Sequence, residues 1–466
     1  MAQLMRCQYC GILQDEPSGA KLCTLCGGEL QYESPPPPDE RDSYLQAHME
    51  LDQVMAPAGQ NCERYLLVTF NAPSQVPGAQ VAKTASGRSP INIALVLDNS
   101  GSMQGNKLSQ AKEAVRRALH RLLDGDVLSL VLFSSEVRCL LEPTPLNPII
   151  RKQVESLLNE ITATSMTALC GGLEMGIEKA QVQKQESNLV LLLSDGLANV
   201  GETDLEKIGG RAAQARRNGL TISTLGVGSD YNEALLAEIA TQGGGRYYHV
   251  EQAGQINAYL NGELGEIANL AGRAVALNLT VAEGVVVIPL ITAYPIQQGG
   301  GKVTLEVGDM PCDTELEIPL RLVLTSQAIG ARLRFEGWVS YRSPAGNHLK
   351  TTLNRVTLRF VDQPAFQLRD GAVKPVVERV MEHFKATGIL GVSYAMTKGD
   401  VESQRKAEEE MSRMRDYANL LGEEAAVKAI RELESEFTNM RAIPSAAKFA
   451  VSAAHSRLRS TKKFTK

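Results

Sequence analysis

The 466-residue sequence lacks an apolar run long enough to cross a membrane, and its start, MAQLMRCQYC, lacks the apolar core of a secretory signal. It also lacks strong charge of either sign. The net charge of −5 gives no general footprint for nucleic acid or a membrane surface. No GxxxxGK[ST] loop occurs, and no GxGxxG is completed ahead of a helix. We therefore expect a cytoplasmic protein with neither membrane nor nucleic-acid partners, in about two to four domains.

Cysteine is scarce over most of the chain but concentrated near its start. Two CxxCG units lie twelve residues apart, and they supply Cys7, Cys10, Cys23 and Cys26. Four thiolates suit a tetrahedral structural Zn²⁺, and the pattern resembles a zinc ribbon over residues 1–32. Disulfides and a redox pair are the alternatives. A cytosolic context disfavours disulfides, and a redox motif needs only one CxxC. Because about thirty residues bury little core, the metal must supply folding energy.

The stretch INIALVLDNSGSM, residues 91–103, joins an apolar segment to a polar loop. The apolar part predicts a strand buried on both faces, and residues 107–123 have helical spacing. Asp98, Ser100 and Ser102 thus follow a central strand, where open α/β sheets bind ligands. Three hard oxygens suit Mg²⁺ or Mn²⁺.

This loop resembles the metal-ion-dependent adhesion site of a von Willebrand factor A (VWA) domain, whose signature is Asp-x-Ser-x-Ser. Thr167 resembles the family's threonine loop, and Asp195, after the buried strand 189–193, resembles its second aspartate. The resemblance covers residues 90–272 and implies a doubly wound, Rossmann-like domain that binds one Mg²⁺ or Mn²⁺. It implies that the hydroxyls ligate directly or through water, while both aspartates mostly hold bound waters. The alternative is that the aspartates are only turn and cap residues.

The rest of the chain predicts further domains. A proline-rich linker is expected at 33–60, helices at 364–440 and a basic tail at 441–466. Residues 273–363 alternate with period two, which indicates a β-sandwich, and a strand within 61–89 is expected to join it. This arrangement resembles bacterial proteins in which a VWA domain interrupts a β-sandwich. The predicted fold class is therefore multidomain α/β, with a small zinc ribbon and C-terminal helices.

The expected function is divalent-cation-dependent protein binding by a scaffold or adaptor. Neutral hydroxyl ligands leave a cation electrophilic, so the Asp or Glu of a partner protein can complete its shell. The alternative is a Mg²⁺-dependent phosphoryl-transfer or hydrolytic enzyme that uses the same site. Ser100 stands where aspartate-nucleophile phosphatases have a second Asp, and no His lies near the motif. A serine site with His249 would lack the GxSxG elbow, so we assign no catalytic residue.

Overall fold

We describe the computed structural model of the protein over residues 3–6, 13–16, 43–76, 90–164, 166–195, 200–228, 230–252, 255–291, 294–363, 366, 372–421 and 423–459. The four cysteines predicted to bind zinc lie outside these residues: Cys7, Cys10, Cys23 and Cys26. Two short strands from the same part of the chain, β1 (Gln3–Arg6) and β2 (Leu13–Glu16), pair antiparallel. The zinc ribbon stays a prediction.

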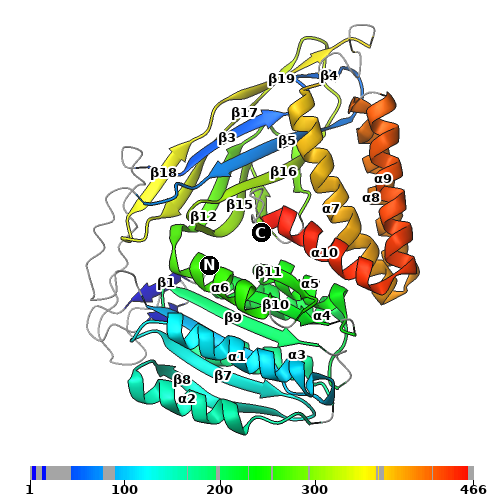
Figure 1. Ribbon diagram of the computed structural model, residues 1–466. Coiled ribbons are helices and arrows are strands. Elements are labelled where there is room, and N and C mark those ends of the chain that lie inside the picture. The colour runs from blue at the N-terminus through cyan, green and yellow to red at the C-terminus, as the bar shows by residue number, and fades with distance from the viewer. Residues whose placement is uncertain are drawn as a thin grey trace.

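An α/β domain occupies the lower half of Figure 1. Its six-stranded sheet has the order β11-β10-β9-β6-β7-β8, parallel except for the edge strand β8. The strands are β6 (Ile91–Asp98), β7 (Val127–Phe133), β8 (Val137–Pro145), β9 (Ser187–Ser194), β10 (Thr221–Val227) and β11 (Gly244–Val250). The helices are η1 (Gly101–Met103), α1 (Asn106–Arg121), α2 (Pro148–Glu160), α3 (Leu169–Val182), α4 (Leu205–Arg217), α5 (Glu233–Gln242) and α6 (Ile256–Ala268).

Alternate side chains of β6 explain how helices cover both faces of this sheet. Ile93 and Leu95 belong to one buried cluster with α1, α2 and α6, whereas Ala94 and Val96 belong to another with α3, α4 and α5. All eight residues of β6 are buried, as expected for a central parallel strand. The chain leaves β6 toward β7 and later returns to β9 on its other side, so the loops after β6 and β9 diverge at a topological switch point.

Two further sheets lie above this domain in Figure 1. One has the order β13-β16-β5-β3, and the other has the order β14-β15-β12-β17-β19-β4 with β18 beside β17. The strands are β3 (Gln46–Leu51), β4 (Met55–Pro57), β5 (Cys62–Asn71), β12 (Leu270–Thr280), β13 (Val286–Pro289), β14 (Ile296–Gly299), β15 (Lys302–Pro311), β16 (Glu315–Leu324), β17 (Arg332–Arg342), β18 (His348–Thr352) and β19 (Val356–Val361). Strand β5, which precedes the α/β domain, pairs along its whole length with β16, which follows it. The α/β domain is therefore inserted between β5 and β12.

The predicted linker at 33–60 is wrong in its second half, because β3 and β4 lie there. Met49 and Leu51 of β3 are buried, while His48 and Glu50, at the alternate positions, stay partly accessible. This alternation is the period-two signal of a strand. It is short, and its charged residues make the segment resemble a linker when composition alone is considered.

The C-terminal helices are α7 (Lys374–Lys398), α8 (Val401–Ala418), η3 (Asn419–Leu421), α9 (Glu423–Ala442) and α10 (Pro444–Arg459). Helix α7 packs on β5, where the Phe384 ring lies 5.3 Å from that of Tyr65. The predicted basic tail at 441–466 is wrong up to Arg459, since α10 is a packed helix in which Ala447, Val451 and Ala454 are buried. No helix in the described part of the chain combines the length and apolarity needed to cross a membrane.

Helix α10 returns to the α/β domain and covers the edge strand β11 (Figure 1). The backbone N–H of Tyr247 donates to His455 Nδ1 at 3.3 Å, and that of His249 donates to Ser452 Oγ at 3.3 Å. Side chains of α10 thus pair backbone donors of β11, and they protect this sheet edge from pairing with another chain.

Candidate metal centre

Asp98, the last residue of β6, is fully buried, and donors hold both of its carboxylate oxygens. Oδ1 accepts from the backbone N–H of Ser100 at 2.8 Å, and Oδ2 accepts from Ser194 Oγ at 2.6 Å. Ser194 ends β9, the neighbouring strand, so the sheet itself brings these groups together. These bonds fix the direction in which the carboxylate faces.

Two serine hydroxyls connect this carboxylate to the second one. Ser100 Oγ and Ser102 Oγ are 3.0 Å apart, and Ser102 Oγ donates to Asp195 Oδ1 at 2.7 Å. Ser100 and Asp195 are buried, whereas Ser102 is exposed. Asp98, Ser100, Ser102 and Asp195 therefore form one hydrogen-bonded chain, through the Ser100 backbone N–H and the two serine hydroxyls, that reaches the surface at the carboxyl edge of the sheet.

Thr167 lies in the loop that joins α2 to α3, and 4% of its surface is exposed. This loop is bonded to the loop after β6: Thr164 N donates to Asn99 O at 2.7 Å, and Asn99 Nδ2 donates to Thr162 O at 3.0 Å. On the far side of Thr167, Ala168 N donates to Ser134 O at 2.7 Å. The structure therefore holds the threonine loop against the ends of both β6 and β7.

The sequence reading missed two participants, Ser194 and Lys107. The Lys107 ammonium, in the first turn of α1, makes a close ion pair with Asp195 Oδ2. A cation is unfavourable at a helix N-terminus, so a lysine there is itself a signal that a carboxylate lies nearby. The loop after β10 packs on this lysine, since a Cβ built on Gly228 would lie 3.2 Å from Nζ.

The electrostatics favour a cation at this place. Burial raises the pKa of Asp98, and the nearby charge of Asp195 acts in the same direction, while hydrogen bonds from Ser100 and Ser194 oppose both effects. Two carboxylates are thus held together in a poorly solvated place, and Lys107 supplies one compensating charge. The three groups together keep a net charge of −1, which favours a divalent cation here.

The spacing of the hydroxyls fits Mg²⁺. Adjacent ligands of an octahedral Mg²⁺ with bonds of about 2.1 Å lie about 3 Å apart, and Ser100 Oγ and Ser102 Oγ are 3.0 Å apart. In the described part of the chain, no group of three or more His, Cys, Asp or Glu side chains could hold a metal. A site here would therefore depend on hydroxyl oxygens, which suit a hard cation.

His249, the histidine considered for a hydrolytic site, lies on β11, the far edge strand of the sheet from β6. Its Nδ1 is 2.6 Å from Tyr231 Oη, and its ring packs edge-on against Phe449 of α10. Burial lowers its pKa, and the charge of Lys448 adds to this effect. These contacts give His249 a role in docking α10.

Comparison with known proteins matches residues 92–261 to the model of the von Willebrand factor type A domain. These residues form a VWA domain. The mouse inter-alpha-trypsin inhibitor heavy chain H3 is 32% identical over 191 residues, which are 39% of this chain but only 21% of that protein. An uncharacterised protein of Synechocystis is 28% identical over 301 residues, 60% of this chain and 68% of that one. The chain thus spans about a fifth of the length of the inhibitor heavy chain.

A solved structure resembles the fold of nearly the whole chain, including the parts outside the VWA domain. A structure described as von Willebrand factor type A from Catenulispora acidiphila covers 91% of this chain and 99% of its own length, with a TM-score of 0.63 and 16% sequence identity. At this identity the likeness concerns the fold alone. It extends well beyond residues 92–261, so the other sheets and the helices share an architecture with that protein.

Proposed function

We propose that the VWA domain binds another protein through a divalent cation, which takes an Asp or Glu side chain of the partner as a ligand. The observation that carries this proposal is the chain of hydrogen bonds from Asp98 through Ser100 and Ser102 to Asp195. These hydrogen bonds bring hydroxyl and carboxylate oxygens together at the carboxyl ends of the strands. Ser102 is exposed, so solvent can reach this group of oxygens.

In this proposal the residues have different roles toward the cation, and these roles allow binding without catalysis. Ser100, Ser102 and Thr167 would hold the cation with neutral oxygens, and Asp98 and Asp195 would orient its bound waters. Lys107 neutralises part of the charge of Asp195, so the cation would be less fully neutralised by its surroundings. The cation, when bound, supplies an electrophilic position that a carboxylate from outside can fill.

The first experiment measures the metal itself by calorimetric titration of the metal-free protein with Mg²⁺ and Mn²⁺. Wild type should bind one ion at this site. Asp98→Asn and Ser102→Ala should lose binding at least tenfold, because each removes an oxygen or a charge from the hydrogen-bonded chain. Asp124→Asn is the matched control: its side chain is 61% exposed and pairs with Arg151, away from the site. Equal affinity in all four proteins would contradict the proposal.

The second experiment tests the partner. A protein captured in Mg²⁺ should be released by chelator and should not be captured by Asp98→Asn. Replacing its contacting Asp or Glu by Asn or Gln should reproduce that loss. Capture that persists in chelator would refute the mechanism. Phosphatase or hydrolase turnover that Asp98→Asn abolishes would favour the enzymatic alternative.

A further inference from the structure

A large cavity with many charged lining residues lies at the end of the VWA sheet opposite the candidate metal centre. The amino ends of β9, β10 and β11 form one wall, and β12 and β15 form the other. Its volume is about 740 Å³, within the range of small-molecule sites, and such sites occur preferentially between domains. The metal centre does not use any of these residues.

The cavity is rich in charge and positive on balance. Among its described lining residues, seven are Lys or Arg and five are Asp or Glu. Arg246 pairs with Glu266 at 2.8 Å, and Arg273 pairs with Glu186. Outside these two pairs, five Lys or Arg side chains and three Asp or Glu side chains line the cavity, so its balance stays positive. The positive charge also affects the neighbouring His455. Burial, and after it the charge of Arg459, lower the pKa of His455 to about 3.

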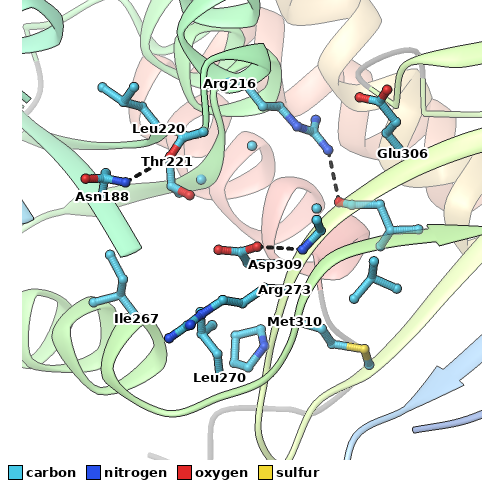
Figure 2. A pocket seen from close by; sticks show the side chains of 18 of the residues that line it. Asn188, Arg216, Leu220, Thr221, Ile267, Leu270, Arg273, Glu306, Asp309 and Met310 are labelled. Atoms are coloured by element: carbon cyan, nitrogen blue, oxygen red, sulfur yellow. Dashed lines mark hydrogen bonds between the residues drawn. The ribbon is translucent and has the colours of Figure 1, made fainter. Parts of the chain in front are cut away.

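Two arginines from distant parts of the chain converge on one glycine. Arg216, in the last turn of α4, donates from Nη2 to Val307 O at 3.0 Å across the cavity (Figure 2). A Cβ on Gly244 would lie 2.9 Å from Arg216 Nε, and Arg459 Nη2 donates to Gly244 O. Burial lowers the pKa of Arg216 to about 10, and the charge of Arg459 acts in the same direction. An anion between the two guanidinium groups would relieve this repulsion.

The opposite wall offers a fixed acceptor. Asp309 Oδ1 accepts from the backbone N–H of Ala274 at 2.9 Å, and Figure 2 shows its carboxylate beside Arg273. Ala274 has a φ of 48°, which is rare outside glycine, and the pairing of β12 with β15 is irregular here. Strained backbone of this kind gathers at ligand sites, where the surrounding structure maintains it.

We propose that this cavity binds a small phosphorylated molecule, with the phosphate between Arg216 and Arg459 and with hydroxyl or amino groups of the molecule donating to Asp309. A phosphate dianion neutralises both guanidinium groups, whereas a carboxylate neutralises one. The volume accommodates a molecule up to the size of a nucleotide. The proposal is independent of the metal-dependent function.

The test is calorimetric titration of the full-length protein with inorganic phosphate and with AMP, in chelator so that the metal centre cannot contribute. At least one probe should bind saturably to wild type. Arg216→Gln and Arg459→Gln should each weaken that binding at least tenfold, since each removes a charge-assisted hydrogen bond. Arg117→Gln is the matched control, because Arg117 is 58% exposed and pairs only locally with Glu113 on α1. Its affinity should equal that of wild type.

A structural role for Arg216 alone predicts a lower melting temperature in Arg216→Gln with probe binding unchanged, and that outcome would overturn the proposal. So would the absence of saturable binding of both probes to wild type. Should Arg216→Gln fail to fold, Arg459→Gln and a crystal of wild type soaked in tungstate decide the question. An anomalous peak between the two guanidinium groups supports the site, and a soaked crystal without one refutes it.

Discussion

Replacing Glu317 with glutamine should loosen the C-terminal helices from the β-sheets, because this carboxylate joins three elements. Glu317 lies on β16, and its side chain is 1% exposed. Oε1 accepts from Arg379 of α7 at 3.1 Å, and Arg457 of α10 lies 3.5 Å from Oε2. His383 of α7 is 3.4 Å from the same oxygen. Glutamine keeps the shape but removes the charge that these groups share.

The size of the effect follows from burial. Removing one partner of a buried ion pair costs about 3–5 kcal/mol. Arg379 and Arg457 stay 31% and 26% exposed, and each keeps a second carboxylate, Glu50 and Glu382 respectively. The cost should therefore be near the lower limit, about 3 kcal/mol. For a cooperative unit of about 150–250 residues this corresponds to a fall in melting temperature of about 6–12 °C.

The assay is thermal unfolding followed by tryptophan fluorescence, because Trp338 on β17 is the one tryptophan in the chain. Burial acts to raise the pKa of Glu317, but His383 and the two arginines outweigh it and hold that pKa below its usual 4.5, so the stabilisation is present above that pH and is lost as the pH falls further. The difference in melting temperature between wild type and Glu317→Gln should therefore be largest at pH 7 and become smaller in acid. Glu63→Gln, which removes a 41%-exposed partner of Arg321, is the control and should cost under about 1 kcal/mol. A Glu317→Gln protein that melts with wild type at pH 7 would refute the reasoning.

Three further predictions concern other parts of the chain. Burial raises the pKa of Asp52 from 3.8 to about 6, so the stability of wild type relative to Asp52→Asn, measured by urea unfolding of both proteins, should fall by about 3 kcal/mol as the pH rises through that window. A Cβ on Gly226 would lie 2.3 Å from the Tyr231 ring, so Gly226→Ala should destabilise by about 1–3 kcal/mol, whereas Gly210→Ala, on helix α4 with open space around it, should stabilise slightly; a Gly226→Ala that melts with wild type, or a Gly210→Ala that melts well below it, would contradict this. Metal analysis should find about one zinc per chain in reduced protein and none in Cys23→Ser.

The sequence predicts those parts of the structure that have a strong local signal. The run from Ile91 to Asp98 predicts a strand buried on both faces, which the structure confirms, and the motif begins at the last residue of this strand. The partners of these residues are less visible: Lys107 pairs with Asp195 across the sheet edge, 88 positions along the chain. The strand at 46–51 and the helix at 444–459 were missed because each has charged residues between its apolar ones, and only tertiary packing separates such segments from linkers and tails.

The insertion itself explains why one end of the VWA sheet is available for a partner and the other is not. The chain enters the domain at the start of β6 and leaves it after α6, which runs back from the carboxyl end of β11. Entry and exit therefore both lie at the amino edge of the parallel strands, and that edge faces β12 and β15 across the cavity. Asp98, the last residue of β6, and Asp195, directly after β9, lie at the opposite edge. An inserted domain of this topology must present its metal-binding edge away from the sheets that carry it, so a large partner can reach that edge without displacing them.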